Sequence, residues 1–144
     1  MADVKQQIEI LRHVPLFTGL NDRQLRSLAK ILTVREYHDG DEIITQGNGG
    51  QGLFIISKGT AKVIRLQPDG EAVEVNRFVP NDFFGELALL DDGVRTASVI
   101  ATSEMQCLIL TRLDFQGILR GDPEMSIVIM RELAKRFRRA LDSI

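Results

Sequence analysis

Residues 83–98, FFGELALLDDGVRTAS, hold one acid and one base within an apolar segment. Glu86 and Arg95 are nine positions apart, with Gly85 directly before the acid and Thr96 directly after the base. A guanidinium can hold a phosphate through two parallel hydrogen bonds, and a neighbouring hydroxyl can donate another. A carboxylate cannot hold phosphate, but it is a good acceptor for a sugar hydroxyl. The pattern therefore indicates a nucleotide site, and a structural ion pair between Glu86 and Arg95 is the alternative.

The run ELALL after Gly85 predicts one helical turn that interrupts a β structure. It is too short for a core helix and poor in the β-branched residues that strands favour. The first backbone N–H groups of such a turn are unpaired, which favours an anion. Because glycine has no Cβ, we expect a ligand to approach the backbone of Gly85 closely.

The hydrophobic period divides the chain into three parts. Residues 1–32 have helical spacing, with a short helix at 2–12 and a second helix that Asn21 or Asp22 can cap. Residues 33–111 change to short β-rich runs separated by glycine turns, which predicts an antiparallel barrel or sandwich. These runs are EIITQ, LFIIS, TAKVIRL, AVEVNRF, TASVIA and MQCLILT.

Residues 112–144 return to helical spacing and predict two helices. Gly121 can cap the first helix, and Asp122 and Pro123 can begin the second as its N-cap and first helical residue. One side of the second helix carries an apolar stripe that fits either the core or a homodimer seam. The stripe comprises Ile127, Met130, Ala134, Phe137 and Leu141. The opposite, mostly basic side fits a solvated face or contact with an acidic partner.

Composition narrows the function classes. A length of 144 residues suits one domain, and a net charge of −2 argues against indiscriminate nucleic-acid binding. No apolar run approaches the roughly 20 residues of a membrane span. The chain starts without a secretory signal pattern, so we expect a cytoplasmic protein. The single cysteine, Cys107, lies in an apolar run typical of inert burial.

An enzyme on a similar β-roll, such as a metal-dependent jelly-roll oxygenase or isomerase, is the main alternative to a binding module. Such sites need clustered histidines with a carboxylate. The chain has only His13 and His38, and it has no serine elbow and no Walker loop. We therefore expect no catalysis, no metal and no cofactor.

The segment FGELALLDDGVRTASVIA resembles the phosphate-binding cassette of cyclic nucleotide-binding domains. LRHVPLFTGL, GDEIITQG, LFIISKGTAKV and DPEMSIVIMRELAKRFRR are similar to other parts of that family, so the resemblance covers nearly the whole chain. The family includes bacterial catabolite activators, regulatory parts of cyclic-nucleotide-dependent kinases and gating domains of some ion channels.

The resemblance implies one α+β domain over 1–144. An antiparallel β-roll at 33–111, a jelly-roll-like double-stranded β-helix, would contain the cassette at 83–98. N-terminal helices at 1–32 and two C-terminal helices at 112–144 would flank it.

The resemblance also implies a role for each cassette residue. Glu86 would accept a hydrogen bond from the ribose 2′-OH of cAMP or cGMP, and Arg95 would pair with the exocyclic phosphate oxygens. The remaining phosphate donors would be the amides near Gly85, Leu87 and Ala88, together with that of Thr96 or Ala97.

The C-terminal helix would act as a mobile lid over the ligand and so regulate an output. By their spacing, Phe137, Ala140 and Leu141 are the expected lid contacts. Ala140 stands where catabolite activators place a base-binding threonine, and Val94 stands where many members have proline. We therefore expect the pocket to accept both cyclic nucleotides.

The output is the part of the function that the residues do not identify. No DNA-reading helix-turn-helix follows the lid, so we expect the chain itself to bind no nucleic acid. The output partner would be another protein or a fused domain, with a homodimer through the C-terminal helix as one arrangement. A degenerate domain used for protein interaction is a further alternative, which the presence of both Glu86 and Arg95 opposes.

Overall fold

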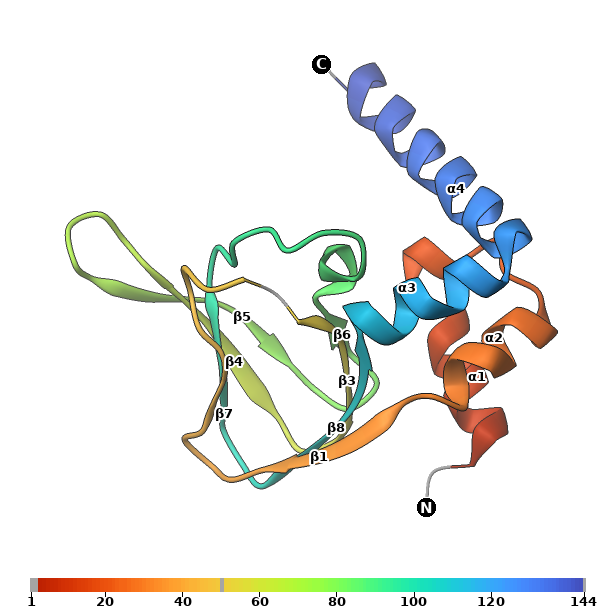
Figure 1. Cartoon of the computed structure of the whole chain (residues 1–144). Helices are drawn as coiled ribbons and strands as arrows, with labels where there is room; N and C mark the ends of the chain where they lie inside the picture. Colours follow the sequence, from red (N-terminus) through yellow and green to blue (C-terminus); the bar gives the residue numbers. More distant parts are fainter. Residues whose placement is uncertain (1–2, 50, 144) are drawn as a thin grey trace. The chain divides into compact units, whose positions relative to one another are not determined.

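The computed structural model of the chain describes residues 3–49 and 51–143, which form two compact units. One unit is the segment Leu32–Arg112, and the other combines the described residues of Met1–Ile31 and Leu113–Ile144. Figure 1 shows that the first unit is built of strands and the second of helices. The assignment of 1–144 to a single functional domain stays a prediction.

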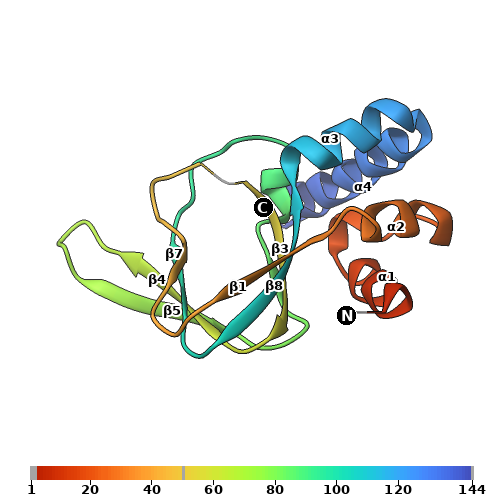
Figure 2. The ribbon, with the colours of Figure 1, turned by 60° about the horizontal axis from the view of Figure 1, so that its bottom comes forward.

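The β unit consists of two four-stranded antiparallel sheets within the described residues. Their strand orders are β1-β8-β3-β6 and β2-β7-β4-β5. The strands are β1 (Thr33–Tyr37), β2 (Glu42–Ile44), β3 (Gly52–Lys58), β4 (Ala61–Leu66), β5 (Ala72–Phe78), β6 (Phe83–Phe84), β7 (Ser98–Ala101) and β8 (Met105–Thr111). Figure 2 shows the two sheets curving into a roll, which confirms the predicted antiparallel β-roll and the α+β class.

The core of the β unit lies between the two sheets. Phe54, Ile56, Phe84, Cys107 and Ile109 are among its buried members. Burial raises the pKa of the Cys107 thiol to about 12, so this cysteine is protonated and inert at neutral pH, as its apolar run predicted.

Each of the six predicted β-rich runs contains a strand, whereas β1 and β6 were not predicted. β1 is exposed along most of its length, so its sequence lacks the apolar alternation of a buried strand. β6 has only two residues and is defined by its pairing with Phe54 and Ile55 of β3. The single helical turn predicted at ELALL is present as η2 (Glu86–Leu89).

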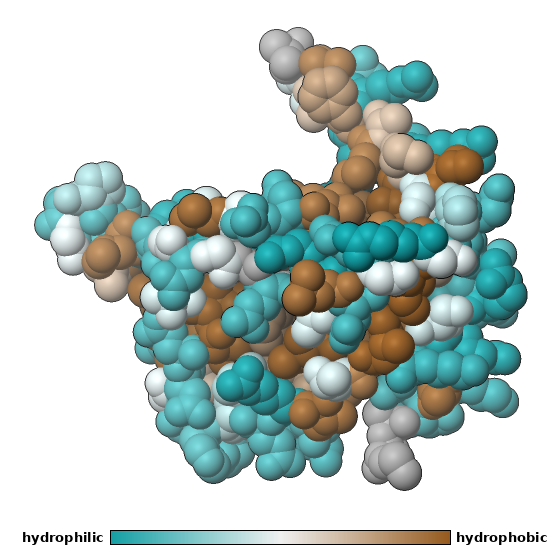
Figure 3. Space-filling view, viewed as in Figure 1, coloured by the Kyte–Doolittle hydropathy of each residue, from teal (hydrophilic) through white to brown (hydrophobic). Residues whose placement is uncertain are grey.

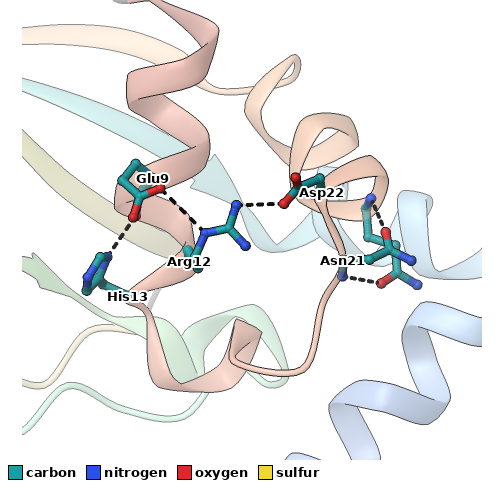
Figure 4. Close-up of polar contacts among 6 residues, drawn as sticks. Glu9, Arg12, His13, Asn21 and Asp22 are labelled. Atoms are coloured by element: carbon teal, nitrogen blue, oxygen red, sulfur yellow. Dashed lines mark hydrogen bonds and ion pairs between the residues drawn. The ribbon is translucent and has the colours of Figure 1, made fainter.

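The helical unit begins its helices where the sequence predicted. Its elements are α1 (Val4–Arg12), η1 (Pro15–Phe17), α2 (Asp22–Ala29), α3 (Arg112–Gly121) and α4 (Pro123–Asp142). The Asn21 side chain accepts from the Gln24 N–H, and the Gln24 side chain accepts from the Asn21 N–H, both at 2.9 Å (Figure 4). An ion pair of 2.6 Å between Arg12 and Asp22 joins the end of α1 to the start of α2. These contacts fix the turn between the two helices.

Two predictions for the C-terminal helices need correction. Gly121 is the last residue of α3 and is not among the glycines with positive φ, so it is not a left-handed cap; the Asp122 side chain instead begins α4 by accepting from Met125 N–H. On α4, the predicted apolar stripe is not the core face, because Met130, Phe137 and Leu141 are 58%, 66% and 51% exposed.

The residues that α4 buries are Met125, Ile129 and Glu132. Figure 3 shows apolar side chains at the surface along α4. None of the helices in the described part of the chain is long and apolar enough to cross a membrane.

Candidate functional site

The candidate site lies where the chain leaves β6 and returns to the sheet at β7. Gly85 has a left-handed backbone, with φ of 85°, and turns the chain from β6 into η2. An exposed loop follows η2 and reaches Arg95, which is half-buried. Only glycine adopts this backbone without a steric cost, which explains its place at the turn.

The Arg95 guanidinium is held between two glycine backbones. Its Nη2 donates a hydrogen bond of 3.2 Å to the carbonyl oxygen of Gly52 at the start of β3. A Cβ on Gly85 would lie 2.5 Å from that oxygen and 2.6 Å from Nη2. In the structure the arginine of the chain itself lies against this backbone, and the close approach of a ligand to Gly85 stays a prediction.

The charge of Arg95 has no carboxylate to compensate it among the described residues. Its Nε is buried and makes no hydrogen bond within the part of the chain that the structure describes. Burial alone lowers the pKa of the guanidinium, with no contribution from a neighbouring charge. A desolvated guanidinium whose pKa has no contribution from a neighbouring charge does not favour the alternative of a structural ion pair between Glu86 and Arg95.

The backbone of Arg95 is clamped by the loop after β2. Gly47 N–H donates to the Arg95 carbonyl at 2.9 Å, and Arg95 N–H donates to the Asn48 carbonyl at 2.8 Å. An isolated bridge between Gly49 and Val94 continues this pairing. Val94, where the resemblance implies a proline in many members, is 67% exposed, so this β-bridge rather than a rigid ring holds the loop.

A pocket of about 140 Å³ opens beside the guanidinium. Arg95, Thr96 and Ala97 of the cassette line it together with five apolar residues, which are Ile44, Val63, Phe78, Phe84 and Val99. Phe84 stacks on Phe54 and on Phe78, with ring centroids 5.1 Å and 5.0 Å apart. The site thus combines one cation with apolar and aromatic walls, an arrangement that suits an anionic ligand with an apolar ring system.

The other predicted cassette residues lie on η2. Glu86 is half-buried at its first position and has an interaction partner within the protein. Leu87 is 56% exposed. The Ala88 N–H donates to the Gly85 carbonyl at 3.0 Å, so this amide is already paired inside the turn.

The predicted lid contacts Phe137, Ala140 and Leu141 all lie exposed on α4 of the helical unit. Their contact with a ligand stays a prediction. Sequence reasoning missed the contribution of Gly52 and the apolar walls of the pocket, which are Ile44, Val63, Phe78, Phe84 and Val99. Gly52 stood among the recurring glycines, but nothing in the sequence marked its carbonyl as the acceptor for Arg95. Phe78 lies half-buried at the end of β5, and its place at the pocket depends on tertiary structure.

No three His, Cys, Asp or Glu side chains among residues 3–49 and 51–143 gather in a way that could hold a metal ion. Comparison with known proteins points elsewhere. Residues 34–122 match the family model described as cyclic nucleotide-binding domain. These residues include every element that surrounds the pocket.

Curated and solved relatives agree with that match. A CRP-like cAMP-activated global transcriptional regulator of Mycobacterium tuberculosis is 31% identical over 136 residues, which cover 94% of this chain and 61% of the relative. This chain therefore spans about three fifths of that relative's length.

Two solved structures extend the comparison. The N-terminal domain of a transcriptional regulator from Streptomyces coelicolor has a TM-score of 0.86 and 32% identity, with 94% of each chain covered. The regulatory domain of Toxoplasma gondii PKA, crystallised with cAMP, has a TM-score of 0.71 and 25% identity. That match covers 94% of this chain and 50% of the other.

Proposed function

We propose that this chain, which belongs to the cyclic nucleotide-binding domain family, binds a cyclic purine nucleotide in the pocket beside Arg95. The observation that carries the proposal is the buried Nε of Arg95, which has no hydrogen-bond partner among the described residues. A buried cation with an unused donor is costly until an anion reaches it. A cyclic phosphate in the pocket beside Arg95 and Thr96 would supply that anion.

Each cassette residue then has a role on the ligand. Arg95 pairs with the exocyclic phosphate oxygens through its guanidinium. The Thr96 hydroxyl and the amides near Gly85, Leu87 and Ala97 add donors to the phosphate, and Glu86 accepts from the ribose 2′-OH. The paired state of the Ala88 amide gives it the smallest part in this set.

The base lies along the apolar walls of the pocket. Val63 and Phe78 can contact a purine ring but offer no side-chain hydrogen bond to its edge. The walls therefore do not distinguish adenine from guanine, and we expect cAMP and cGMP to differ in affinity by no more than about tenfold. The relatives named for cAMP support cAMP as one of the two ligands.

The bound nucleotide regulates an output rather than reacting. In this scheme α4 closes on the base through Phe137, Ala140 and Leu141, and a ligand that contacts the closed state better shifts the population toward it. The exposed apolar side chains of α4, Met130 among them, also fit a homodimer seam. A transcriptional output, as in the Mycobacterium tuberculosis relative, would need sequence beyond the length that this chain covers.

Isothermal titration calorimetry of the purified chain against cAMP, cGMP and AMP tests the proposal. We expect saturable binding of both cyclic nucleotides and much weaker binding of AMP. Arg95→Ala should weaken cAMP by about 2–4 kcal/mol, because it removes one partner of a charged hydrogen bond in a partly buried site. Wild-type affinity in Arg95→Ala, or no binding of either cyclic nucleotide to the wild type, would overturn it.

A further inference from the structure

The ladder between β4 and β7 stops just before the cassette. The two strands pair antiparallel, and their last pair is Ile64 opposite Ser98. In a regular antiparallel ladder every second residue points its backbone N–H and C=O toward the same neighbouring strand. The next residue of β4 to face β7 would therefore be Leu66, and its partner would be Thr96. Thr96 is instead in a bend outside the strand and lines the pocket. The departure of Thr96 leaves the N–H and C=O of Leu66 without a strand to pair with.

The side chain of Gln46 takes the place that Thr96 leaves in the ladder. Its Nε2 donates to the Leu66 carbonyl at 3.3 Å, and its Oε1 accepts from the Leu66 N–H at 2.7 Å. A carboxamide has the same donor and acceptor as a peptide group, so it can replace one residue of a β-ladder. The half-buried glutamine thereby satisfies the backbone of Leu66, which would otherwise need water or another strand.

The backbone around Gln46 holds the two ends of the segment that has left the ladder. The Gln46 N–H donates to the Ser98 hydroxyl at 2.8 Å, at the start of β7. The next residues of the same loop, Gly47 and Asn48, form the two backbone hydrogen bonds to Arg95. The loop that contains Gln46 thus holds Arg95 and Ser98, the residues on either side of Thr96 and Ala97. The Gln46 side chain also occupies the position opposite Leu66 in the ladder.

We propose that Gln46 is a positioning residue for the ligand site. Its side chain replaces Thr96 in the β4–β7 ladder, so that Thr96 and Arg95 can face the pocket. The inference rests on the proposed function for its effect on the nucleotide. The replacement of Thr96 by the Gln46 side chain as the hydrogen-bond partner of Leu66 is a property of the ligand-free protein. It can therefore be tested without a ligand. Without the Gln46 carboxamide, the free groups of Leu66 compete for the backbone of Thr96 and pull it toward the sheet.

Gln46→Ala and Gln46→Glu test the inference, with Gln106→Ala as the matched control. Gln106 is a half-buried glutamine on β8, in the other sheet, whose Oε1 accepts from the Ser57 hydroxyl at 3.0 Å. In the ligand-free protein, hydrogen exchange of the Leu66 backbone amide with solvent should accelerate in Gln46→Ala. It should stay slow in Gln46→Glu, because the glutamate keeps the acceptor oxygen, and in the control Gln106→Ala. In Gln46→Ala we expect the NMR chemical shift of the Thr96 backbone amide to change. We also expect the affinity for cAMP to fall about tenfold, which is roughly the free energy of one lost hydrogen bond.

The outcomes separate this inference from the proposed function. Wild-type exchange at Leu66 in Gln46→Ala would overturn the ladder replacement. Equal losses of cAMP affinity in Gln46→Ala and Gln106→Ala would reduce Gln46 to a general structural role and overturn positioning. If the wild-type chain binds no cyclic nucleotide, the proposed function fails, while the exchange at Leu66 and the shift of Thr96 still decide the positioning role.

Discussion

Gly85→Ala tests whether the packing of Arg95 requires a residue without a Cβ at the turn of the cassette, independently of the ligand. At φ of 85°, a left-handed alanine costs about 1–2 kcal/mol of stability. Its Cβ would also lie 2.5 Å from the Gly52 oxygen and 2.6 Å from Arg95 Nη2, and the first of these is backbone that cannot swing away. Crowding of this kind costs about 1–3 kcal/mol, so we expect a total loss of about 2–5 kcal/mol.

Gly70→Ala is the matched control, because Gly70 has φ of 88° and a Cβ there would meet nothing within 4 Å. Urea unfolding of both variants should show only the backbone strain in Gly70→Ala and the additional crowding in Gly85→Ala. Calorimetry should show near wild-type cAMP affinity in Gly70→Ala and a loss of at least tenfold in Gly85→Ala, since the guanidinium is displaced. Equal stabilities of the two variants, or an intact cAMP site in Gly85→Ala, would refute the packing argument.

Three further predictions concern single side chains. Glu86→Gln should weaken the binding of cAMP more than that of 2′-deoxy-cAMP in a competitive titration, because only cAMP has the 2′-hydroxyl that donates to the carboxylate. Equal losses of affinity would mean that Glu86 orients the loop instead. Thr96→Ala should weaken cGMP more than cAMP by about 1 kcal/mol if its hydroxyl also reaches the guanine amino group, and equal losses would restrict it to the phosphate. Cys107, with its pKa raised to about 12 by burial, should react with a thiol reagent at pH 8 only as fast as the protein unfolds, and rapid labelling of the native protein would contradict its place in the core.

The short turn and the helix starts could be predicted because their causes are local. Gly85 followed by ELALL indicates a turn by composition alone, and Asp122 with Pro123 specifies a helix start by side-chain capping and a fixed φ. β6 could not be predicted, because two residues have no period and become a strand only by pairing with β3.

The apolar period of α4 shows why a pattern does not identify the covered face. The stripe that includes Met130 and Phe137 has helical spacing, but the helical unit buries Met125 and Ile129 instead. Both sets are apolar and both satisfy the period, so only the packing of the folded chain distinguishes a core face from an exposed one.

The cassette could be singled out from the sequence, and the roles of its residues on a ligand stay predictions, but the surroundings of Arg95 could not be predicted. The acid and the base in one segment indicate a nucleotide site, with an ion pair between them as the alternative. The two differ in whether the folded chain offers the base a carboxylate, and among residues 3–49 and 51–143 the guanidinium donates to the carbonyl of Gly52 while no neighbouring charge contributes to its pKa. One neutral acceptor holds the guanidinium in place but cannot neutralise it.

That arrangement explains why the site should remain formed without its ligand. The Gly52 carbonyl and the clamp from Gly47 and Asn48 orient Arg95 in advance, so binding does not have to immobilise a free side chain. Within the part of the chain that the structure describes, the Nε without a hydrogen-bond partner and the charge without a carboxylate make an anion a ligand class that would relieve the desolvation of the cation. Preorganisation by the backbone and an unmet charge together favour a tight phosphate site, whereas a partner carboxylate would have stabilised the empty protein at the expense of binding.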